Sequence, residues 1–247
     1  MIDQSTDKPI RINKFLSMCG VTSRRGAETL ISEKRVTVND STVEELGTVV
    51  LPDRDIVKVD GVAVTPVTRN SYVLLNKPIR VMTTLHDPFK RTTVANLVAG
   101  VSERVYPVGR LDYDTSGVLL LTNDGELAYR LTHPKYGVKK VYEATVLGKF
   151  TLVQVREITS GVRLSDGAMG RAEVRILGHL KNQSRIQLTL TEGRKREVRQ
   201  LCLAVGFPVR KLRRVLFGGI SSHGMKTGDW RFLTSREVAD LKRQVDL

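Results

Sequence analysis

The chain has 247 residues, of which 40% are hydrophobic, so it is long enough to bury a substantial core and is not wholly disordered. Lysine and arginine together number 40 against 26 aspartates and glutamates, a formal net charge of +14 at pH 7. A balance that basic favours a polyanionic partner, because neutralising phosphates releases condensed counterions. Residues 1–70 hold equal numbers of basic and acidic residues, so the excess charge lies in residues 71–247.

The cysteines and histidines give no sign of a disulfide framework or a metal site. Cys19 and Cys202 are the only cysteines and lie far apart, which suits a reducing compartment. The four histidines lack metal-ligand spacing. The polar start MIDQSTDKP does not resemble a signal peptide, and no run of about 18 apolar residues occurs. We therefore expect a cytoplasmic protein with no membrane segment and no bound metal.

The N-terminal region is predicted to form two short helices followed by strands. Apolar residues recur at helical spacing in residues 11–20, and Ser23 can cap a second helix. Arg24 and Arg25 begin that helix, where the helix N-terminus favours anions. The strands and hairpin turns that follow are predicted at residues 36–38, Asn39-Asp40, residues 56–59 and Asp60-Gly61.

The order of the segments SRR, RVTVN and VKVDG resembles the small RNA-binding module named after a small-subunit ribosomal protein, the S-four domain. The resemblance covers residues 9–67, with a linker at residues 68–71. A generic α+β mini-domain without affinity for RNA is the alternative. The resemblance implies that four cations contact the RNA backbone: Arg24, Arg25, Lys34 and Arg35.

Residues 72–247 read as a second, strand-rich domain with interspersed helices, so the fold class is α+β. Strands are predicted at residues 72–75, 118–122, 141–146, 172–177 and 185–191. Helices are predicted to begin near Glu126 and to cover residues 151–158, 194–205 and 235–245.

A polar loop at residues 109–117 carries an arginine and two carboxylates between two apolar segments. Loops held on rigid strands often carry catalytic groups, although an isolated aspartate more often caps a turn. The segment GRLDYDTSGVLLLTNDGELA resembles the signature of the RsuA-type pseudouridine synthases. The resemblance implies that Asp112, which follows Arg-Leu, is the catalytic aspartate. Asp114 falls at a variable position and receives no catalytic role.

Two further segments resemble elements of the same family. KVY matches a K-x-Y element and implies that Tyr142 packs against the flipped base and acts late as a general base. TEGRKREVRQ matches a glycine turn that leads into a basic helix, and implies that Arg199 pairs with Asp112. An ordinary strand aromatic and a solvated basic face are the respective alternatives.

Residues 194–214 hold eight basic residues and a single acid, Glu197, which is too lopsided for a self-neutralising surface. Phosphate binding accounts for most of these cations. The RNA contacts predicted in the second domain are Lys77, Arg110, Lys140, Arg194, Lys195, Arg196, Arg213 and Arg214.

The matches to the family cover roughly residues 9–235 and are strongest with its branch that modifies large-subunit ribosomal RNA. The resemblance implies a mainly antiparallel sheet and the isomerisation of a uridine in ribosomal RNA. It also implies that the target base is flipped out of its stack. The resemblance leaves two roles open for Asp112, attack on the anomeric carbon or removal of the 2′ proton. No atoms enter or leave, so no cofactor is required. The expected partner is ribosomal RNA or a pre-ribosomal particle, and the expected state is a monomer.

Departures from the family pattern cluster on loops expected to face RNA. Arg80 stands where a glycine is usual, Phe89-Lys90 stands in a segment that usually reads Asp-Pro-x-Gly-Arg, and Lys139 replaces an acidic residue. These changes add bulk or charge without touching the proposed chemistry.

Two other functions fit parts of the chain. A non-enzymatic RNA-binding ribosome-assembly factor needs only the N-terminal module. An RNA methyltransferase would want a glycine-rich loop after an early strand, whereas the paired glycines Gly218-Gly219 come after the last basic strand. The three catalytic elements together favour the synthase.

Overall fold

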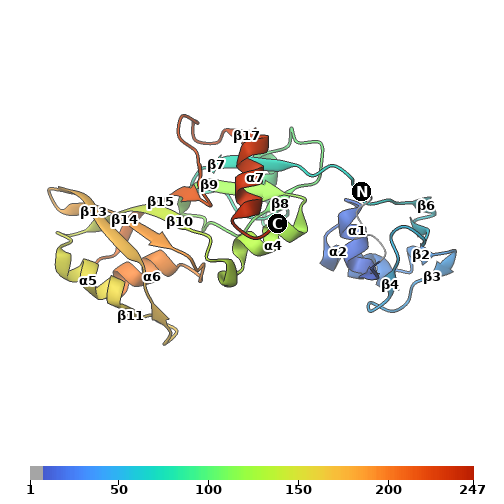
Figure 1. Ribbon diagram of the computed structural model, residues 1–247, viewed down its shortest axis with the longest axis horizontal. Coiled ribbons are helices and arrows are strands. Elements are labelled where there is room, and N and C mark those ends of the chain that lie inside the picture. Colours follow the sequence, from blue (N-terminus) through green and yellow to red (C-terminus); the bar gives the residue numbers. More distant parts are fainter. Residues whose placement is uncertain (1–7) are drawn as a thin grey trace. The chain divides into compact units, whose positions relative to one another are not determined.

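The computed structural model describes residues 8–247 and divides into two compact units, Met1–Asn70 and Ser71–Leu247 (Figure 1). The predicted linker at residues 68–71 includes this division. The first seven residues of the polar start MIDQSTDKP lie outside the described residues. No helix in residues 8–247 combines the length and the apolar character needed to cross a membrane.

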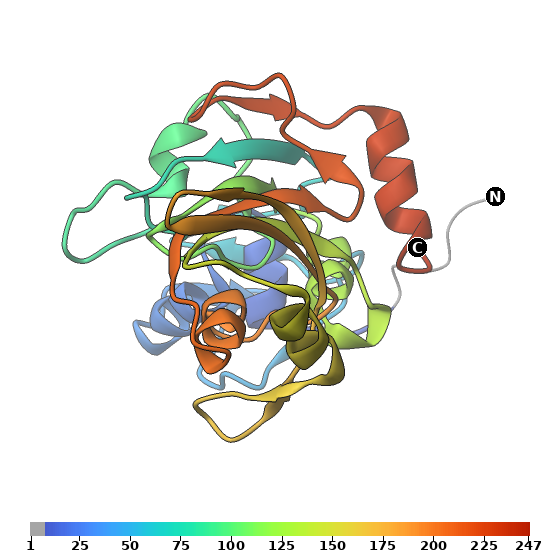
Figure 2. The same ribbon diagram turned by 90° about the vertical axis from the view of Figure 1, so that its left-hand side faces the viewer.

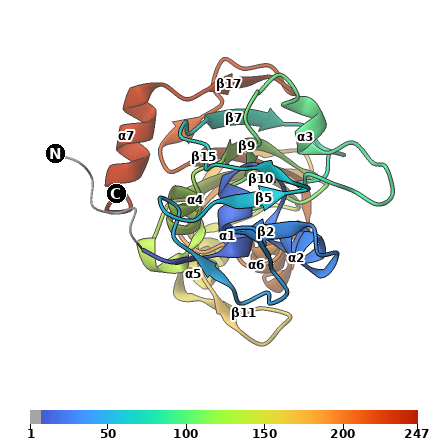
Figure 3. The ribbon, with the colours of Figure 1, turned by 90° about the vertical axis from the view of Figure 1, so that its right-hand side faces the viewer.

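The first unit packs two helices against short strand pairs, as Figure 3 shows for α1 and α2 beside β2 and β5. Its elements are β1 Ile10–Arg11, α1 Ile12–Met18, α2 Arg24–Ser32, β2 Val36–Val38, β3 Ser41–Thr42, β4 Val49–Val50, β5 Val57–Val59 and β6 Val62–Ala63. Ser23 caps α2 as predicted, because its hydroxyl accepts a hydrogen bond from the Gly26 amide at 3.0 Å. Asn39, Asp40 and Asp60 all have positive φ, which confirms both hairpin turns.

The second unit is built on a nine-stranded sheet whose main path runs β13-β14-β10-β15-β9-β7-β17. Only the β9–β15 pair is parallel among its described pairings, so the predicted mixed, mainly antiparallel α+β fold is confirmed. The sheet strands are β7 Tyr72–Lys77, β8 Tyr106–Pro107, β9 Thr115–Thr122, β10 Lys140–Leu147, β13 Glu173–Leu180, β14 Gln183–Leu190, β15 Val209–Phe217, β16 Ile220–Ser221 and β17 Trp230–Phe232. A separate hairpin pairs β11 Val162–Arg163 with β12 Met169–Gly170.

Helices cover the sheet and bury three clusters of core residues. They are α3 Val94–Leu97, α4 Gly125–Thr132, the 3-10 helix η1 Pro134–Tyr136, α5 Leu152–Ser160, α6 Glu197–Ala204 and α7 Ser235–Arg243. Figure 2 shows α5 and α6 next to each other beside the β13–β14 hairpin, where Ile158 and Leu201 join one core. Along β9, Leu120 belongs to one cluster and Leu119 to another, as expected of a strand buried on both faces.

Helix α6 begins three residues later than predicted. Arg194, Lys195 and Arg196 therefore lie in the loop before the helix, and the prediction of a basic helix over residues 194–205 is wrong at its start. Arg196 adopts a left-handed conformation with φ of 54°, and the Glu197 carboxylate accepts a hydrogen bond from the Arg194 amide at 3.0 Å. This local turn competes with helix formation and leaves the three cations on a loop.

Gly117 permits the parallel pairing that organises the site. It lies opposite Arg214, with φ of 106°. A Cβ added there would overlap the carbonyl oxygen of Arg214 and lie 2.9 Å from its backbone nitrogen and carbonyl carbon. Glycine therefore lets β9 and β15 approach closely, with the loop that carries Asp112 directly before β9.

Candidate active site

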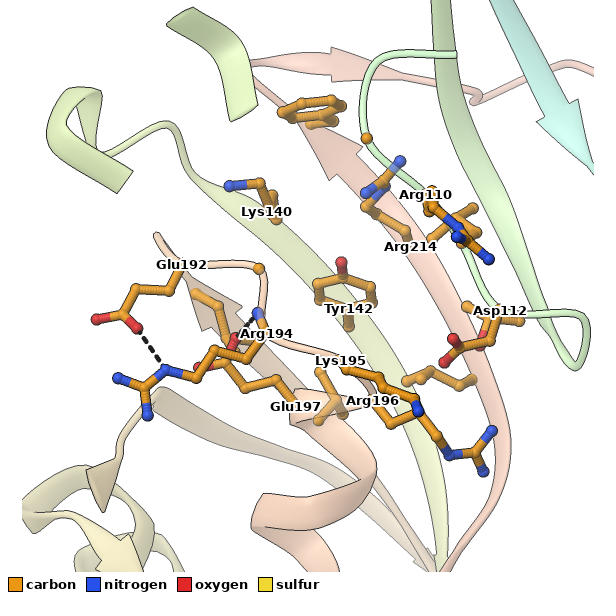
Figure 4. A pocket seen from close by; sticks show the side chains of 18 of the residues that line it. Arg110, Asp112, Lys140, Tyr142, Glu192, Arg194, Lys195, Arg196, Glu197 and Arg214 are labelled. Atoms are coloured by element: carbon orange, nitrogen blue, oxygen red, sulfur yellow. Dashed lines mark hydrogen bonds and ion pairs between the residues drawn. The ribbon is translucent and has the colours of Figure 1, made fainter. Parts of the chain in front are cut away.

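A pocket of about 690 Å³ lies where the loop before β9 meets β10, β15 and the loop before α6 (Figure 4). Its charged or phenolic lining residues are Arg110, Asp112, Lys140, Tyr142, Glu192, Arg194, Lys195, Arg196, Glu197 and Arg214. Apolar lining includes Leu111, Leu212 and Phe217. The pocket thus offers apolar walls for a flat ring and many cations for a polyanion.

The loop around Asp112 is held by a buried lysine. The Lys77 side chain is fully buried, and its ammonium donates hydrogen bonds to the carbonyl oxygens of Asp112 at 3.2 Å, Thr115 at 3.0 Å and Pro78 at 2.9 Å. Burial lowers the Lys77 pKa to about 8, against the opposing pull of Asp112 and Asp114. The prediction that Lys77 contacts RNA is wrong, because its three donors face the protein backbone.

A second clamp holds the same loop. The Thr83 hydroxyl donates to the Leu111 carbonyl at 2.6 Å and accepts from the Leu111 amide at 3.3 Å. The Arg80 amide donates to the Tyr113 carbonyl at 2.6 Å. The backbone on both sides of Asp112 is therefore fixed before any ligand arrives, which favours a preorganised carboxylate.

The Asp112 carboxylate is partly exposed in the pocket and has no hydrogen-bond or ion-pair partner among residues 8–247. Arg199, predicted to pair with it, instead pairs with Asp114, with Nη2 to Oδ2 at 2.8 Å. Arg199 also donates to the carbonyls of Asp114 and Val209, both at 3.1 Å. The predicted Asp112–Arg199 pair is therefore wrong in this structure. The carboxylate and carbonyl of Asp114, two residues further along the loop, and the Val209 carbonyl on β15 hold the guanidinium instead.

Asp114 thus has a role that its variable position did not suggest. Its carboxylate contacts Arg199 and also lies 3.7 Å from Arg196. Arg199 does not appear among the described residues that line the pocket. Together, Asp114 and Arg199 tie the Asp112 loop to α6, which the motif spacing alone does not indicate.

Tyr142 and Arg214 reach the pocket from neighbouring strands. Tyr142 on β10 lies opposite Arg214 on β15, which lies opposite Gly117 on β9. This row across three strands places a phenol and a guanidinium beside the first residues of β9, which follow the Asp112 loop (Figure 4). Tyr142 also packs against two apolar clusters, so its ring is held in position.

Lys140 and Arg214 are buried rather than exposed, with 6% and 2% of their surfaces accessible. Lys140 donates to the carbonyls of Val138 at 3.3 Å and Thr191 at 3.1 Å. Burial, followed by the charge of Arg214, lowers the Lys140 pKa to about 8. These two residues therefore belong to the pocket wall, and their burial does not fit contacts with the phosphates of an RNA backbone.

Other predicted cations are better placed for a polyanion. Arg110, Lys195, Arg196 and Arg213 are exposed. Arg110 lines the pocket and has no ion-pair partner in the described part of the chain. Arg194 is more constrained, because it pairs with Glu192 at 3.0 Å and donates to the Met169 carbonyl at 2.9 Å.

The cations of the first unit differ in the same way. Arg24 and Arg25 are exposed at the start of α2 and form no ion pair with any residue from 8 to 247. Lys34 pairs with Glu44 at 3.0 Å. Arg35 pairs at 2.7 Å with Asp60 and at 3.0 Å with Glu33. A phosphate would therefore compete with carboxylates for Lys34 and Arg35, but not for Arg24 and Arg25.

Two pocket residues were missed by the motif analysis. Glu197 is buried, and desolvation raises the pKa of its carboxyl. Phe217 forms an apolar wall beneath Arg214. The single acid in a run of cations was the available signal for Glu197, whereas nothing in the local sequence distinguishes Phe217 from an ordinary core residue.

The unusual loop residues adopt conformations that glycine adopts freely. Arg80 has φ of 63° and Lys90 has φ of 56°, both in the left-handed region. The absent glycines would have relieved this local cost. The two cations therefore strain the loop backbone locally as well as adding positive charge.

No cluster of three or more metal-binding side chains is found in residues 8–247.

Comparisons with known proteins agree with these observations. Residues 71–204 match the family model described as RNA pseudouridylate synthase, and residues 10–57 match the S4 domain. An RNA pseudouridine synthase of Aquifex aeolicus is 44% identical over 96% of both chains. The ribosomal large subunit pseudouridine synthase B of Bacillus subtilis is 42% identical over 96% of this chain and 97% of its own. A crystal structure of a pseudouridylate synthase gives a TM-score of 0.68 at 26% identity, covering 94% of this chain and 99% of that chain.

Proposed function

The chain belongs to the RNA pseudouridylate synthase family and is a pseudouridine synthase, and we propose that its substrate is a uridine in a stem-loop of large-subunit ribosomal RNA. The observation that carries the proposed site is the meeting of Asp112, Tyr142 and Arg214 in one pocket with apolar walls. The name of the Bacillus subtilis relative supports the choice of RNA.

The reaction begins when the target base leaves its stack. Extrusion costs about a few kcal/mol, and least where the base is already unpaired, as in a loop or bulge. Arg110, exposed at the pocket and without an ion-pair partner in the described chain, fills the space that the base leaves or grips the adjoining phosphate. Lys195 and Arg196 hold further phosphates at the pocket edge.

Asp112 then acts at the ribose. Its carboxylate either attacks the anomeric carbon or removes the 2′ proton, and in both cases the bond between that carbon and N1 breaks. The clamps from Lys77 and Thr83 act on backbone atoms, which leaves the carboxylate oxygens free for the sugar. Arg199 is a positioning residue in this scheme, because it reaches the Asp112 loop through Asp114.

Tyr142 manages the detached base. Its ring packs against the uracil while the base turns to present C5 to the anomeric carbon. Formation of the carbon–carbon bond expels the Asp112 carboxylate from the anomeric carbon, or Asp112 returns the 2′ proton in the glycal route. The phenolic oxygen of Tyr142 then accepts the proton that remains on C5 as its own proton passes to N1, so both residues end unchanged. No atoms enter or leave during this sequence, so the reaction itself requires no cofactor.

Asp112→Asn tests the site against the matched variant Asp114→Asn. Asp112→Asn should abolish pseudouridine formation, measured by tritium release and by carbodiimide primer extension, and should retain RNA affinity. Asp114→Asn removes the same charge from the same loop but should only slow the reaction, because it loosens Arg199. Substantial product from Asp112→Asn would refute the assignment.

The alternative raised by the sequence, a non-enzymatic ribosome-assembly factor, is supported only by the RNA-binding first unit and does not account for the synthase match over residues 71–204. The tritium-release assay separates the two, because an assembly factor would release no label from any ribosomal RNA. We place the synthase in the cytoplasm, where its RNA substrate would be made, and expect it to act as a monomer.

A further inference from the structure

Arg214 is a buried cation with unused hydrogen-bond donors. Its Nε donates to the Val118 carbonyl at 2.7 Å, while Nη2 is fully buried without a partner. Nη1 also has no hydrogen-bond partner among residues 8–247, and no carboxylate of that part of the chain lies within ion-pair distance. Buried donors of a charged group are normally satisfied, so the site lacks an acceptor that a ligand would bring.

The position of the guanidinium is defined on several sides. The guanidinium lies over the Phe217 ring, with 4.7 Å from Cζ to the ring centroid. On the adjacent strand β10, Tyr142 is paired with Arg214. The ammonium of Lys140 adds a second positive charge, since the charge of Arg214 contributes to lowering the Lys140 pKa. Figure 4 shows Arg214 between Arg110 and Tyr142 in the pocket that also holds Asp112. A planar, electron-rich acceptor that enters beside Tyr142 therefore meets this guanidinium.

We propose that Arg214 is a catalytic residue that binds a carbonyl oxygen of the flipped uracil and stabilises the base as it leaves the ribose. The inference rests on the proposed function of the pocket. When the bond between the anomeric carbon and N1 breaks, its electron pair moves to N1 and is shared with O2 and O4. A guanidinium donor to either oxygen binds more strongly as this negative charge develops, which lowers the barrier. Arg214 keeps all of its protons, and the electron pair returns to carbon when C5 joins the ribose.

The identity of the acceptor follows from the surroundings. A phosphate would also accept hydrogen bonds from a guanidinium. The phosphates, however, stay with the RNA backbone outside the pocket, where the exposed side chains of Arg110, Lys195 and Arg196 can reach them. Arg214 is 2% exposed and has Phe217 beneath it, with Leu212 also in the wall. Such a site suits the edge of a flat neutral ring that becomes charged only during the reaction.

Sulfur substitution in the substrate tests the contact atom by atom. The substrate is the shortest large-subunit ribosomal RNA hairpin that the wild-type protein modifies, with uridine, 2-thiouridine or 4-thiouridine at the target. Single-turnover rates are measured with the wild type and with Arg214→Met and Arg214→Lys. Sulfur is a weak acceptor, so one of the two thio substrates should slow the wild type by roughly tenfold or more. Arg214→Met should slow the uridine reaction by about 10²-fold or more, with RNA affinity retained.

The decisive result is the coupling between side chain and substrate atom. In Arg214→Met, the thio substrate that slows the wild type should lower the single-turnover rate by less than about twofold relative to uridine, because the hydrogen-bond donor is already absent. The neighbouring exposed arginine provides the matched control: Arg213→Met should weaken RNA binding and keep the wild-type sulfur effect. A full sulfur effect in Arg214→Met, or a loss of RNA affinity with an unchanged rate, would assign the contact elsewhere and overturn the proposal.

The wild-type measurement decides the question even if both Arg214 variants unfold. Equal rates on all three substrates would exclude a carbonyl contact in the rate-limiting step and overturn the inference. Failure of the proposed function looks different, because Asp112→Asn would then still form pseudouridine. An inactive Asp112→Asn with a sulfur-insensitive wild type would leave the proposed function standing and remove only the role of Arg214.

Discussion

Gly117→Ala should disrupt the site without touching a catalytic side chain. The added Cβ would overlap the Arg214 carbonyl oxygen and lie 2.9 Å from two more Arg214 backbone atoms. Ordinary contacts require roughly 3.5 Å, so β9 and β15 must separate locally by on the order of 0.5–1.5 Å. The φ of 106° adds a second cost, because residues with a Cβ rarely adopt it.

The magnitude follows from these two terms. Strained backbone costs about 1–3 kcal/mol and overpacking a further 1–3 kcal/mol, so the free energy of unfolding should fall by roughly 2–6 kcal/mol. At about 2–4 °C per kcal/mol for a unit of this size, the melting temperature should drop by roughly 4–24 °C. The displacement also moves the Asp112 loop relative to Arg214, and a shift near 1 Å can reduce a rate by about 10²-fold.

Calorimetry and single-turnover pseudouridine formation measure the two effects, with Gly167→Ala as control. Gly167 has φ of 84° in the β11–β12 hairpin, and a Cβ there meets no atom within 4 Å. The control therefore carries the backbone cost without the clash, and should lose about 1–2 kcal/mol with an unchanged rate. Equal destabilisation by the two variants, with full activity in both, would refute the argument from close strand approach.

Three other predictions concern the lysine clamp, the strained loop and the RNA grip. Lys77→Met should reduce stability and activity. The difference in unfolding free energy between wild type and variant should widen from pH 8 to about 10.5, because in that window the unfolded wild type binds more protons than the folded wild type. A difference independent of pH in urea titrations would contradict the lowered pKa of Lys77. Arg80→Gly should raise the melting temperature, because glycine adopts the left-handed conformation freely. The relief adds about 1–2 kcal/mol to the free energy of unfolding, from which the extra chain entropy of glycine is subtracted. A clear fall in melting temperature would show that the Arg80 side chain itself stabilises the loop. The double variant Arg24→Ala, Arg25→Ala should weaken RNA binding and reduce the slope of log affinity against log salt concentration by up to about 2. An unchanged slope in filter-binding titrations would exclude these two arginines as phosphate contacts.

Local features of the chain were predictable wherever the signal came from near neighbours in the sequence. The cap at Ser23 and the turn at Asn39-Asp40 follow from residue types that satisfy or permit the backbone there. The loop of Asp112 between an apolar segment and a buried strand was also predicted, as was the strand of Tyr142. The motif spacing then brought both residues to one pocket.

The partner of Arg199 could not be predicted from the motif. The motif associates this arginine with the catalytic aspartate, but Asp114 stands two residues further on and offers both its carboxylate and its carbonyl. Which carboxylate a guanidinium reaches depends on how α6 lies against the loop, and a shift of one or two residues along the chain exchanges the partners. The late start of α6 belongs to the same problem, because the turn around Arg196 competes with the helix.

By itself, the sequence determined the α+β class, most of the helices and strands, the family, and the aspartate and tyrosine of the site, because periodicity, caps, turns and motifs are properties of contiguous segments. Only the tertiary structure decided what each cation does. Lys77 and Arg110 carry the same charge, yet one is buried beneath the Asp112 loop and the other is exposed at the pocket. Arg213 and Arg214 are adjacent in sequence, yet they point to opposite faces of β15. Strand pairing over long separations sets which face is buried, and burial makes one arginine a surface charge and the other a donor inside the pocket.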